Sequence, residues 1–526
     1  MQPVATTDEN WKPSHSPWSI SLAVMLATFI FILDSTIANV ALPHMAGTFS
    51  ASQEESIWIL TSYLIASGII LPSVAWFSNV FGRKNFFIAC ILIFTFASVL
   101  CGFSTSLEMM LIARILQGIG GGAMLPVSQA IMMESFPVEK RGMAMSIFAL
   151  GVVTAPVIGP LLGGWLTDNF SWNWIFFINL PFGLLAAILS NMFIEDPPYA
   201  RKKGLQKIDY VGFGLLIIWL VTLQIVLDKG QNADWFNADW ICVLSGISVV
   251  SMICFFVSQL NNKDSIIDLS VFKDKNFASG TALLTGINAI LYSSIAIMPL
   301  FLQMLLGYTA YLSGVATMPR GAGSLLAIAI TAVFSGKIDD RIVVFIGLLC
   351  IGVSSIWLGF LNLDISMMNI VVPNIIMGMG LGFCIVPLSV LSLSTLSNDK
   401  MTNASGVQSL LKTIGGAIGT SIVSTMLSRY AQMHQFSMVK NLTPLNPVFK
   451  YKLESIQGML SQYMDPVTAA RKADFLIYGQ LLKQSVLWAY MDAFRIFGVA
   501  CLCLAPFLLL LKKADISKKS DMSAMH

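Results

Sequence analysis

Long apolar stretches are the feature that most limits how this sequence can fold. Fourteen of them are long enough to cross a bilayer, for which a helix needs about 20 mostly apolar residues. Backbone N–H and C=O groups surrounded by lipid must be satisfied within the segment, so each stretch is predicted to be a helix. The predicted spans are residues 17–43, 54–78, 86–103, 108–134, 143–166, 173–194, 208–229, 239–261, 276–305, 312–334, 343–361, 366–396, 403–430 and 486–511.

The composition agrees with a chain that lies mostly in lipid. Of the 526 residues, 56% are hydrophobic and only 11% are charged, whereas soluble domains carry about 25% charged residues. The eight cysteines fall in apolar stretches without a C-x-x-C pair, and the four histidines lie in tails, loops or segment ends. The sequence also contains no Walker motif GxxxxGK[ST]. We therefore expect neither an intramembrane haem or metal enzyme nor direct use of ATP.

The distribution of Lys and Arg sets the predicted orientation. With the N-terminus inside, basic residues gather in the cytoplasmic loops and tails, and the short outer loops hold only Lys229. Residues 1–16 and 512–526 are then cytoplasmic tails. The exception is a long outer loop at 431–484, which contains several basic residues; long loops do not follow the rule.

A short internal repeat indicates two related halves. "FSNVFGRK" (77–84) follows the second span and "FSGKIDDR" (334–341) follows the tenth. Six helices in each half leave two over, so the predicted layout is 6+2+6. The halves are residues 17–194 and 276–511, and linkers with the extra helix pair fill 195–275. Repeated halves around a central site are typical of secondary transporters, although a repeat this short also arises by chance.

Asp34 lies well inside the first apolar stretch, within "FILDSTIANVALP". A charge at that depth costs ~2.5 kcal/mol or more, so an acid retained there is a candidate for function. It is the only acidic residue that the sequence places deep in a span. The depth of Arg114 differs by only ~5 Å, at ~1.5 Å per residue, and Arg114 is the expected partner. The alternatives are a purely structural ion pair and an arginine that extends to the outer surface.

Six segments are similar to the sequence motifs of one transporter family. They are "LDSTIANVALP" (33–43), "AWFSNVFGRK" (75–84), "RILQGIGGG" (114–122), "GVVTAPVIGPLLGGWLTD" (151–168), "SWNWIFFINLPFG" (171–183) and "GYTAYLSGVATMPRGAG" (307–323). On these segments the chain resembles the major facilitator superfamily, specifically the 14-helix drug:proton antiporters of the EmrB/QacA type. The resemblance covers nearly the whole chain. It implies an all-α membrane fold in which two pseudo-symmetric six-helix bundles surround a central cavity.

The resemblance also implies a cycle driven by the proton gradient, with no cofactor. Asp34 would bind the coupling proton, and Arg114 would modulate its protonation. The fifth span resembles the antiporter signature and is expected to act as a pivot that seals against proton leak; ordinary tight packing is the alternative. Small residues four apart allow close helix approach, and prolines favour a kink. The residues concerned are Gly151, Pro156, Gly159, Pro160, Gly163 and Gly164.

The two basic loops are expected to gate the cytoplasmic side, although they also serve simply to fix orientation. Asn79 stands where the family usually has aspartate and Ala75 where it has glycine, which favours gating by the second half. Lys412 stands where the family often has arginine. The gating candidates are Asn79, Gly82, Arg83, Lys84, Asp339, Asp340 and Arg341.

The substrate cavity is defined least by the sequence. Its candidates are polar or aromatic residues within the spans: Asn39, Tyr63, Gln117, Gln129, Tyr292, Gln303, Asn374 and Gln408. The 28 methionines and 34 phenylalanines suit an adaptable apolar cavity, and they suit lipid-facing helices equally. One usable acid in an apolar cavity fits lipophilic or amphipathic compounds, weak cations among them.

The long outer loop contains a candidate amphipathic helix at 451–464. Leu453, Ile456, Leu460 and Tyr463 recur there near helical spacing. This segment could cap the bundle as a lid. The resemblance offers another role, since pumps of this type work with an EmrA-like membrane-fusion adaptor and an outer-membrane channel.

These observations predict a proton-coupled antiporter of the bacterial inner membrane. It would export lipophilic or amphipathic drugs and toxic compounds by alternating access. A dedicated exporter or importer of one metabolite is the alternative. A membrane-embedded enzyme would need intramembrane histidines or clustered acids with a nucleophile, and the spans supply neither.

Overall fold

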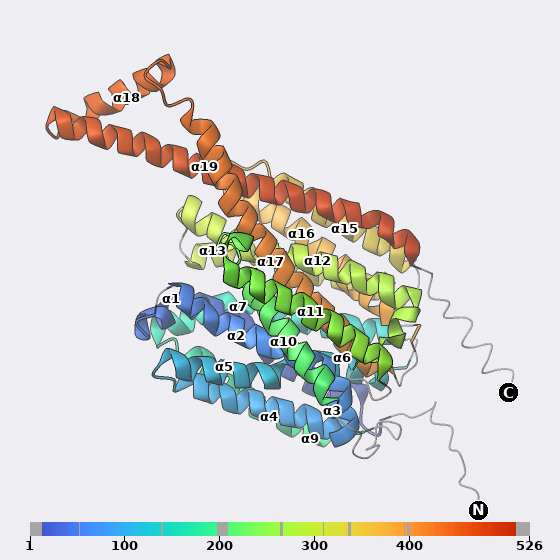
Figure 1. Ribbon diagram of the computed structural model, residues 1–526. Coiled ribbons are helices and arrows are strands. Elements are labelled where there is room, and N and C mark those ends of the chain that lie inside the picture. Colours follow the sequence, from blue (N-terminus) through green and yellow to red (C-terminus); the bar gives the residue numbers. More distant parts are fainter. Residues whose placement is uncertain are drawn as a thin grey trace, which may run out of the picture.

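The computed structural model describes residues 13–51, 53–137, 140–196, 209–262, 267–308, 310–334, 338–393, 395–396 and 400–511. Within these residues every regular element is a helix (Figure 1). Thirteen helices are long and apolar enough to cross a membrane, and a shorter apolar helix, Trp58–Ile70, stands where the second span is predicted. The prediction of an all-α, 14-helix membrane protein is confirmed.

The N-terminal half contains six spans. The second, fourth and sixth are each built from two consecutive helices. The elements are α1 (Pro17–Thr48), α2 (Gln53–Ile70), η2 (Leu71–Ser73), α3 (Val74–Phe81), α4 (Arg83–Gly102), α5 (Leu107–Gly122), α6 (Met124–Ser135), α7 (Arg141–Asn169), α8 (Trp174–Phe177) and α9 (Asn179–Phe193).

The extra pair and the C-terminal half follow in chain order. The pair is α10 (Tyr210–Lys229) and α11 (Asp239–Asn261), joined through η5 (Trp235–Asn237). The C-terminal half comprises η6 (Leu269–Lys273), α12 (Lys275–Leu300), η7 (Phe301–Leu305), α13 (Ala310–Thr317), α14 (Pro319–Phe334), α15 (Asp340–Leu358), α16 (Met368–Leu393), α17 (Met401–Val439), α18 (Pro447–Leu460), α19 (Pro466–Leu504) and η9 (Ala505–Leu510).

Prolines mark where several spans are interrupted. Proline has no N–H and its ring clashes with the preceding turn. Pro72 lies in the 3-10 turn between α2 and α3, and Pro319 opens α14 directly after the break that ends α13. After Pro299, α12 continues as a single π-helical turn. These breaks explain why the second span contains no single helix of full spanning length.

The two halves share one continuous core at only one end of the molecule. We call the end at which the described chain begins and finishes the terminal end, and the opposite end the hairpin end (Figure 1). Near the terminal end, buried side chains of the C-terminal half, among them Ile328, Val386, Met401 and Val407, join the core of the N-terminal half. Toward the hairpin end the two halves have separate cores. The described conformation is therefore packed shut at the terminal end.

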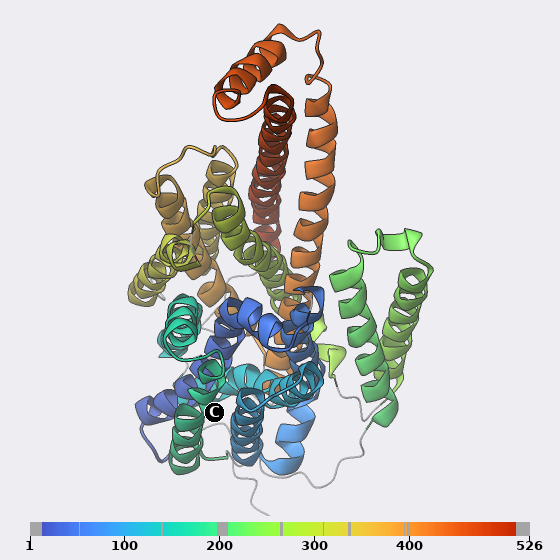
Figure 2. The same ribbon diagram turned by 90° about the vertical axis from the view of Figure 1, so that its left-hand side faces the viewer.

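The extra pair lies beside the two bundles (Figure 2). Helix α10 contacts α2 of the N-terminal half and α17 of the C-terminal half, whereas α11 packs mainly on α10. Asp209 caps α10 through the N–H of Gly212, and its other carboxylate oxygen accepts a 2.7 Å hydrogen bond from Gln259 of α11. A buried polar contact thus holds α10 and α11 together, and α10 packs the pair against the two bundles.

The structure corrects the prediction of a long outer loop at 431–484. Most of that segment is helical, because α17 continues to Val439 and α19 begins already at Pro466. Asn446 and Asp465 cap the helices that follow them. The two long helices project beyond the bundle as a hairpin with α18 at its tip (Figure 1).

The amphipathic helix is present but does not close the bundle. Helix α18 covers residues 447–460, four residues earlier than predicted at each end, and Tyr463 lies outside it with 85% of its surface exposed. Leu453, Ile456 and Leu460 are half-buried, and the helix packs on α19. Because it stands away from the bundle, the prediction of a lid is wrong (Figure 1).

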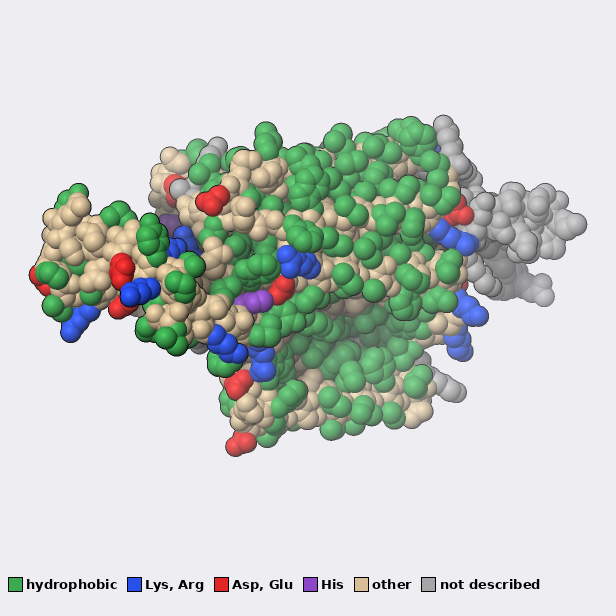
Figure 3. All heavy atoms as spheres, turned by 90° about the horizontal axis from the view of Figure 1, so that it is seen from above, with side chains coloured by type: hydrophobic (Ala, Val, Ile, Leu, Met, Phe, Trp, Pro, Cys, Tyr) green, Lys and Arg blue, Asp and Glu red, His purple; other side chains and the backbone are tan. Residues whose placement is uncertain are grey.

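The side of the molecule visible in Figure 3 carries a broad belt of hydrophobic side chains. Most charged side chains in this view lie at the two ends and on the projecting hairpin, and one small group of basic, acidic and His side chains lies nearer the middle, bordered by the belt (Figure 3). A surface of this kind suits lipid around the belt and water at the ends, as expected of a multi-pass membrane protein.

Candidate functional site

Asp34 lies about halfway along α1, and its carboxylate is fully enclosed. Its Oδ2 atom accepts a hydrogen bond of 2.7 Å from Nη1 of Arg114. Its Oδ1 atom accepts hydrogen bonds from Gln117 at 2.9 Å and from Asn179 at 2.8 Å. Helices α1, α5 and α9 thus meet at one buried carboxylate with three donors.

Arg114 is also enclosed completely. Its Nε donates to the carbonyl oxygen of Ile59 at 3.0 Å, and Nη1 also donates to Oε1 of Gln117 at 2.7 Å. The guanidinium lies 4.2 Å from the centre of the Tyr63 ring, where the negative face of the ring favours a cation. The sequence predicted Arg114 as the partner of Asp34 from its similar depth alone, and the structure places the two side chains in direct contact.

One member of this cluster, Asn179, is not among the site residues predicted from the sequence. It begins α9, and its Nδ2 donates both to Asp34 and to Oγ of Ser98, at 2.9 Å. An amide within the apolar segment "FFINLPFG" was the available signal. It carries no charge, so hydropathy does not single it out. The cluster shows that Asn179 orients the carboxylate rather than compensating it.

The cluster can respond chemically to a proton on Asp34. A buried carboxylate and guanidinium compensate each other, whereas a buried charge left alone is strongly destabilising. Protonation of Asp34 would leave Arg114 without its counter-charge. The neutral carboxyl group would also be a weaker acceptor for its three hydrogen-bond donors than the carboxylate is. A proton at this position therefore favours a different packing of α1, α5 and α9.

Helix α7 packs closely against α1 beside this cluster. A Cβ atom on Gly159 would lie 2.2 Å from Oγ1 of Thr36, and one on Gly163 would lie 3.1 Å from the carbonyl oxygen of Ile37. Both positions face the turn of α1 that follows Asp34. The two glycines, predicted to share a face, allow the helices to approach where a side chain would hold them apart.

The remaining residues of the antiporter segment contribute less to this contact. A Cβ atom on Gly151 would lie 3.1 Å from Cε of Met25, a close contact that the flexible end of the methionine side chain can relieve, and Gly164 is half-buried. Helix α7 continues through Pro156 and Pro160 without a break. The side chain of Pro160 lies outside the described residues.

Two acidic residues, Glu134 and Asp196, bind the first gating loop. Arg83 is buried and forms an ion pair with Glu134 of α6. Gly82 has φ of +83°, a conformation that favours glycine, and lies against the Asp196 carboxylate. That carboxylate accepts a 2.8 Å hydrogen bond from the backbone N–H of Lys84. Asn79 is half-buried in α3.

The second gating loop makes more local contacts. Asp339 caps α15 by accepting a hydrogen bond from the N–H of Arg341 at 3.1 Å, and Nε of Arg341 lies 4.0 Å from the same carboxylate. Asp340 is half-buried in the first turn of α15. Among the described residues the stronger inter-helix contacts belong to the first loop. Residues 335–337 of the second loop lie outside the described residues, and dominance of gating by the second half stays a prediction.

A polar contact outside the membrane connects η6 to the start of α17. Asp268 lies 3.6 Å from Nζ of Lys400 and accepts a hydrogen bond from the N–H of Ser270. Burial raises the pKa of Asp268, but the Ser270 hydrogen bonds and the charge of Lys400 outweigh it and hold that pKa below its ordinary value. This carboxylate stays ionised and fixes the loop at the terminal end.

The predicted cavity residues do not form one site. Tyr63 and Gln117 belong to the Asp34 cluster. Gln408 is buried and donates to Ser392 at 2.7 Å, and Gln129 is buried in α6. The structure exposes Gln303 in the π-helical turn η7 and places Tyr292, 46% exposed, against Gly416 of α17. The side chain of Asn39 lies outside the described residues.

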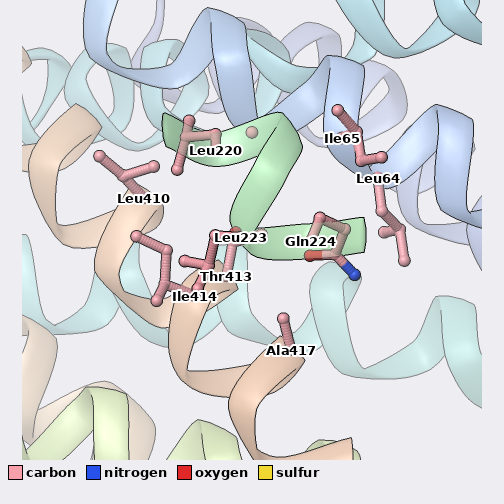
Figure 4. A pocket seen from close by; sticks show the side chains of 10 residues that line it. Leu64, Ile65, Leu220, Leu223, Gln224, Leu410, Thr413, Ile414 and Ala417 are labelled. Carbon is pink, nitrogen blue, oxygen red and sulfur yellow. The ribbon is translucent and has the colours of Figure 1, made fainter. Parts of the chain in front are cut away.

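An apolar pocket lies where both halves meet the extra pair (Figure 4). Helices α2, α10 and α17 line it, and Gln224 and Thr413 are its polar side chains. The remaining lining residues are Leu64, Ile65, Gly68, Leu220, Leu223, Leu410, Ile414 and Ala417. The sequence reasoning assigned no site role to α10, which here forms one wall.

The structure also reveals a cation in the C-terminal half to which the sequence analysis gave no role. Arg320 of α14 donates to Oδ1 of Asn374, from Nε at 3.0 Å and from Nη2 at 2.8 Å, and Nη2 also donates to Oγ of Ser294 at 3.0 Å. The signal in the sequence was an arginine within the apolar run that follows "GYTAYLSG". Asn374, predicted to line the cavity, instead binds this guanidinium.

Comparison with known proteins shows the family to which the chain belongs. A family model described as Major Facilitator Superfamily matches residues 24–420. The chain is 35% identical to the multidrug export protein EmrB of Haemophilus influenzae, over 82% of this chain and 84% of that protein. It is 34% identical to the fatty acid resistance protein FarB of Neisseria gonorrhoeae, over 81% of this chain and 83% of that protein.

Two solved structures share the fold at low sequence identity. A double tryptophan mutant of XylE superimposes with a TM-score of 0.63 at 14% identity, covering 98% of this chain and all of that one. The human organic anion transporter MFSD10 superimposes with a TM-score of 0.62 at 12% identity, covering 94% of this chain and all of that one. At such identities the similarity concerns the fold alone.

Proposed function

Because the chain belongs to the Major Facilitator Superfamily, we propose that it is a proton-coupled antiporter that exports lipophilic or amphipathic compounds. The observation that carries this proposal is the buried Asp34–Arg114 ion pair, with its side chains fully enclosed. An ionisable pair at that depth needs a function to offset its desolvation, and proton relays in transporters use such groups. The proton gradient is the driving force, and no cofactor is involved.

In the proposed cycle, Asp34 alternates between two protonation states. The ionised carboxylate holds α1, α5 and α9 together through Arg114, Gln117 and Asn179. A proton weakens that link and allows α1 to move against α7 along the Gly159–Gly163 contact. The described conformation, closed at the terminal end, is one of the two states that alternating access requires.

The names of the relatives support the substrate class. One is a multidrug export protein and another a fatty acid resistance protein, and both names fit compounds with a large apolar part. By the distribution of Lys and Arg, we place both termini in the cytoplasm and the protein in the bacterial inner membrane. The terminal end is then the cytoplasmic end.

We further propose that the hairpin binds an EmrA-like membrane-fusion adaptor, which connects the pump to an outer-membrane channel. Helices α17 and α19 carry α18 well beyond the bundle (Figure 1). Tyr451, Met459 and Tyr463 at this tip are each more than half exposed. Large exposed apolar side chains away from lipid are typical of a protein contact.

The decisive experiment is transport in everted membrane vesicles with a panel of lipophilic dyes. Asp34→Asn keeps the size and most hydrogen bonds of the side chain but cannot take up and release a proton. We expect this variant to lose proton-coupled uptake of dye. Asp364→Asn is the control and should transport normally, because Asp364 is an exposed acid between α15 and α16, away from the cluster. Undiminished coupling in Asp34→Asn would overturn the proposal.

A further inference from the structure

Arg320 is a cation deep in the C-terminal half with neutral partners only. It lies ten residues into the span that begins at Ala310, about 15 Å along the helix and thus near the middle of a ~30 Å hydrocarbon core. Its hydrogen-bond partners are the Asn374 amide and the Ser294 hydroxyl. Among the described residues no carboxylate pairs with it. Guanidinium groups keep their charge in proteins, so this site carries an uncompensated positive charge.

The N-terminal half supplies the comparison. Arg114, which is buried in α5, also donates to an amide oxygen, that of Gln117 on the same helix, as Arg320 of α14 donates to that of Asn374 on α16. Asp34 stands 17 residues after the first residue of α1, and Ser294 stands 19 residues after the first residue of α12. Each of these two helices is the first span of its half. A serine therefore occupies, in the C-terminal half, nearly the position at which the N-terminal half has its carboxylate.

The donors of Arg320 are used incompletely. The hydrogen bonds to Asn374 and Ser294 involve Nε and Nη2, and Nη1 has no partner among the described residues. Both N–H groups of Nη2 are committed, one to Asn374 and one to Ser294, so the groups left to donate to an anion are the two N–H groups of Nη1. With Nε and one edge of Nη2 fixed by Asn374, the guanidinium is oriented in advance and its Nη1 side is available to an anion.

We propose that Arg320 binds the anionic head group of the transported amphiphile, which supplies the carboxylate that the C-terminal half lacks. This inference rests on the proposed export function and names its substrate class: a lipophilic chain that ends in a carboxylate or a similar small anion. Asn374 and Ser294 are positioning residues that orient the guanidinium. Coupling proton and substrate then occupy corresponding positions in opposite halves.

The test is equilibrium binding to the full chain in nanodiscs, without a gradient, against empty nanodiscs. Three probes share a twelve-carbon chain: dodecanoate, 1-dodecanol and dodecyltrimethylammonium, at a pH that keeps the acid ionised. We expect Arg320→Gln to weaken dodecanoate binding roughly tenfold or more and to leave dodecanol binding unchanged. Arg320→Lys, which keeps the charge, should recover most of the affinity. Arg495→Gln is the matched control, because Arg495 already has Asp492 as a partner.

Two results with the Arg320→Gln variant would overturn the inference, and so would one with the unmodified protein. One is dodecanoate binding to Arg320→Gln as tight as to the unmodified protein. The other is an equal loss of all three probes in Arg320→Gln, which would mean that the arginine only maintains the fold. Equal affinity for the three head groups in the unmodified protein would also contradict it, while leaving proton-coupled export intact. If none of the three binds, and vesicles transport none of them or of the dyes, the proposed function itself fails.

Discussion

The Nη1 atom of Arg114 lies 2.7 Å from Oδ2 of Asp34, and neither side chain has any exposed surface. The two residues are 80 positions apart in the sequence, so the contact exists only because the packing of the N-terminal half brings the long side chain of Arg114 on α5 to Asp34 on α1. Two further donors, on Gln117 and Asn179, complete the coordination of the carboxylate.

The first prediction concerns the stability of this pair. Arg114→Leu leaves the Asp34 carboxylate buried without a counter-charge and should cost about 3–5 kcal/mol, whereas the double variant Asp34→Leu, Arg114→Leu should be far closer to the unmodified protein. Thermal unfolding of the purified protein in detergent measures both. Strictly additive losses in the double-mutant cycle would show that the two groups do not interact energetically.

A second prediction tests the contact between α7 and α1. Gly159→Ala places a methyl group 2.2 Å from Oγ1 of Thr36, so the helices must separate beside Asp34. We expect a stability loss of about 1–3 kcal/mol, as for overpacked cores, together with slower dye transport. Adding Thr36→Ala removes the hydroxyl and should restore part of both.

The matched control for this substitution is Gly214→Ala in α10. A Cβ atom there meets nothing within 4 Å, and alanine has the higher helix propensity, so stability should hold or rise by up to ~1 kcal/mol. Normal transport in Gly159→Ala would mean that the close approach of α7 to α1 is dispensable.

The fold could be predicted largely from hydropathy, because lipid permits only apolar helices of a certain length. The break in the second span was missed, since Pro72 does not alter the apolar character of that run. The helical hairpin was not predicted, because its segments are polar. Residues 431–439 and 466–485 are too polar to count as spans, yet they continue α17 and α19 as helices outside the bundle.

The site was predictable only where a charge interrupts an apolar run. Asp34 and Arg114 met that criterion, whereas Asn179 is a neutral amide and escaped it. Arg320 met it as well but had no acid at its depth to suggest a pair. The pairing of Arg83 with Glu134 depends on how α4 and α6 pack, which no local pattern in the sequence specifies.

A third prediction addresses the first gating loop. Gly82 has φ of +83° and ψ of 145°, a region populated almost only by glycine, and a side chain there costs about 1–3 kcal/mol in the backbone alone. Its Cβ atom would also lie 2.7 Å from Oδ2 of Asp196, which accepts the N–H of Lys84. Gly82→Ala should therefore lower the unfolding temperature, and Gly68→Ala in α2, where the space is open, should not. Equal melting temperatures for the two variants would contradict the proposed strain.

The last prediction separates the hairpin from transport itself. Replacing Pro447–Leu460 by a Gly/Ser linker of the same 14 residues removes the surface of α18. A flexible linker of that length spans roughly 20 Å on average, close to the ~21 Å of the helix it replaces, so α17 and α19 can keep their positions. Because α18 packs on α19 and not on the bundle, dye uptake by everted vesicles should be unchanged. Co-purification of a co-expressed membrane-fusion adaptor should be lost, and with it the resistance of whole cells. Retained adaptor binding would place the contact elsewhere on the pump, and lost vesicle transport would mean that the tip supports the transport cycle directly.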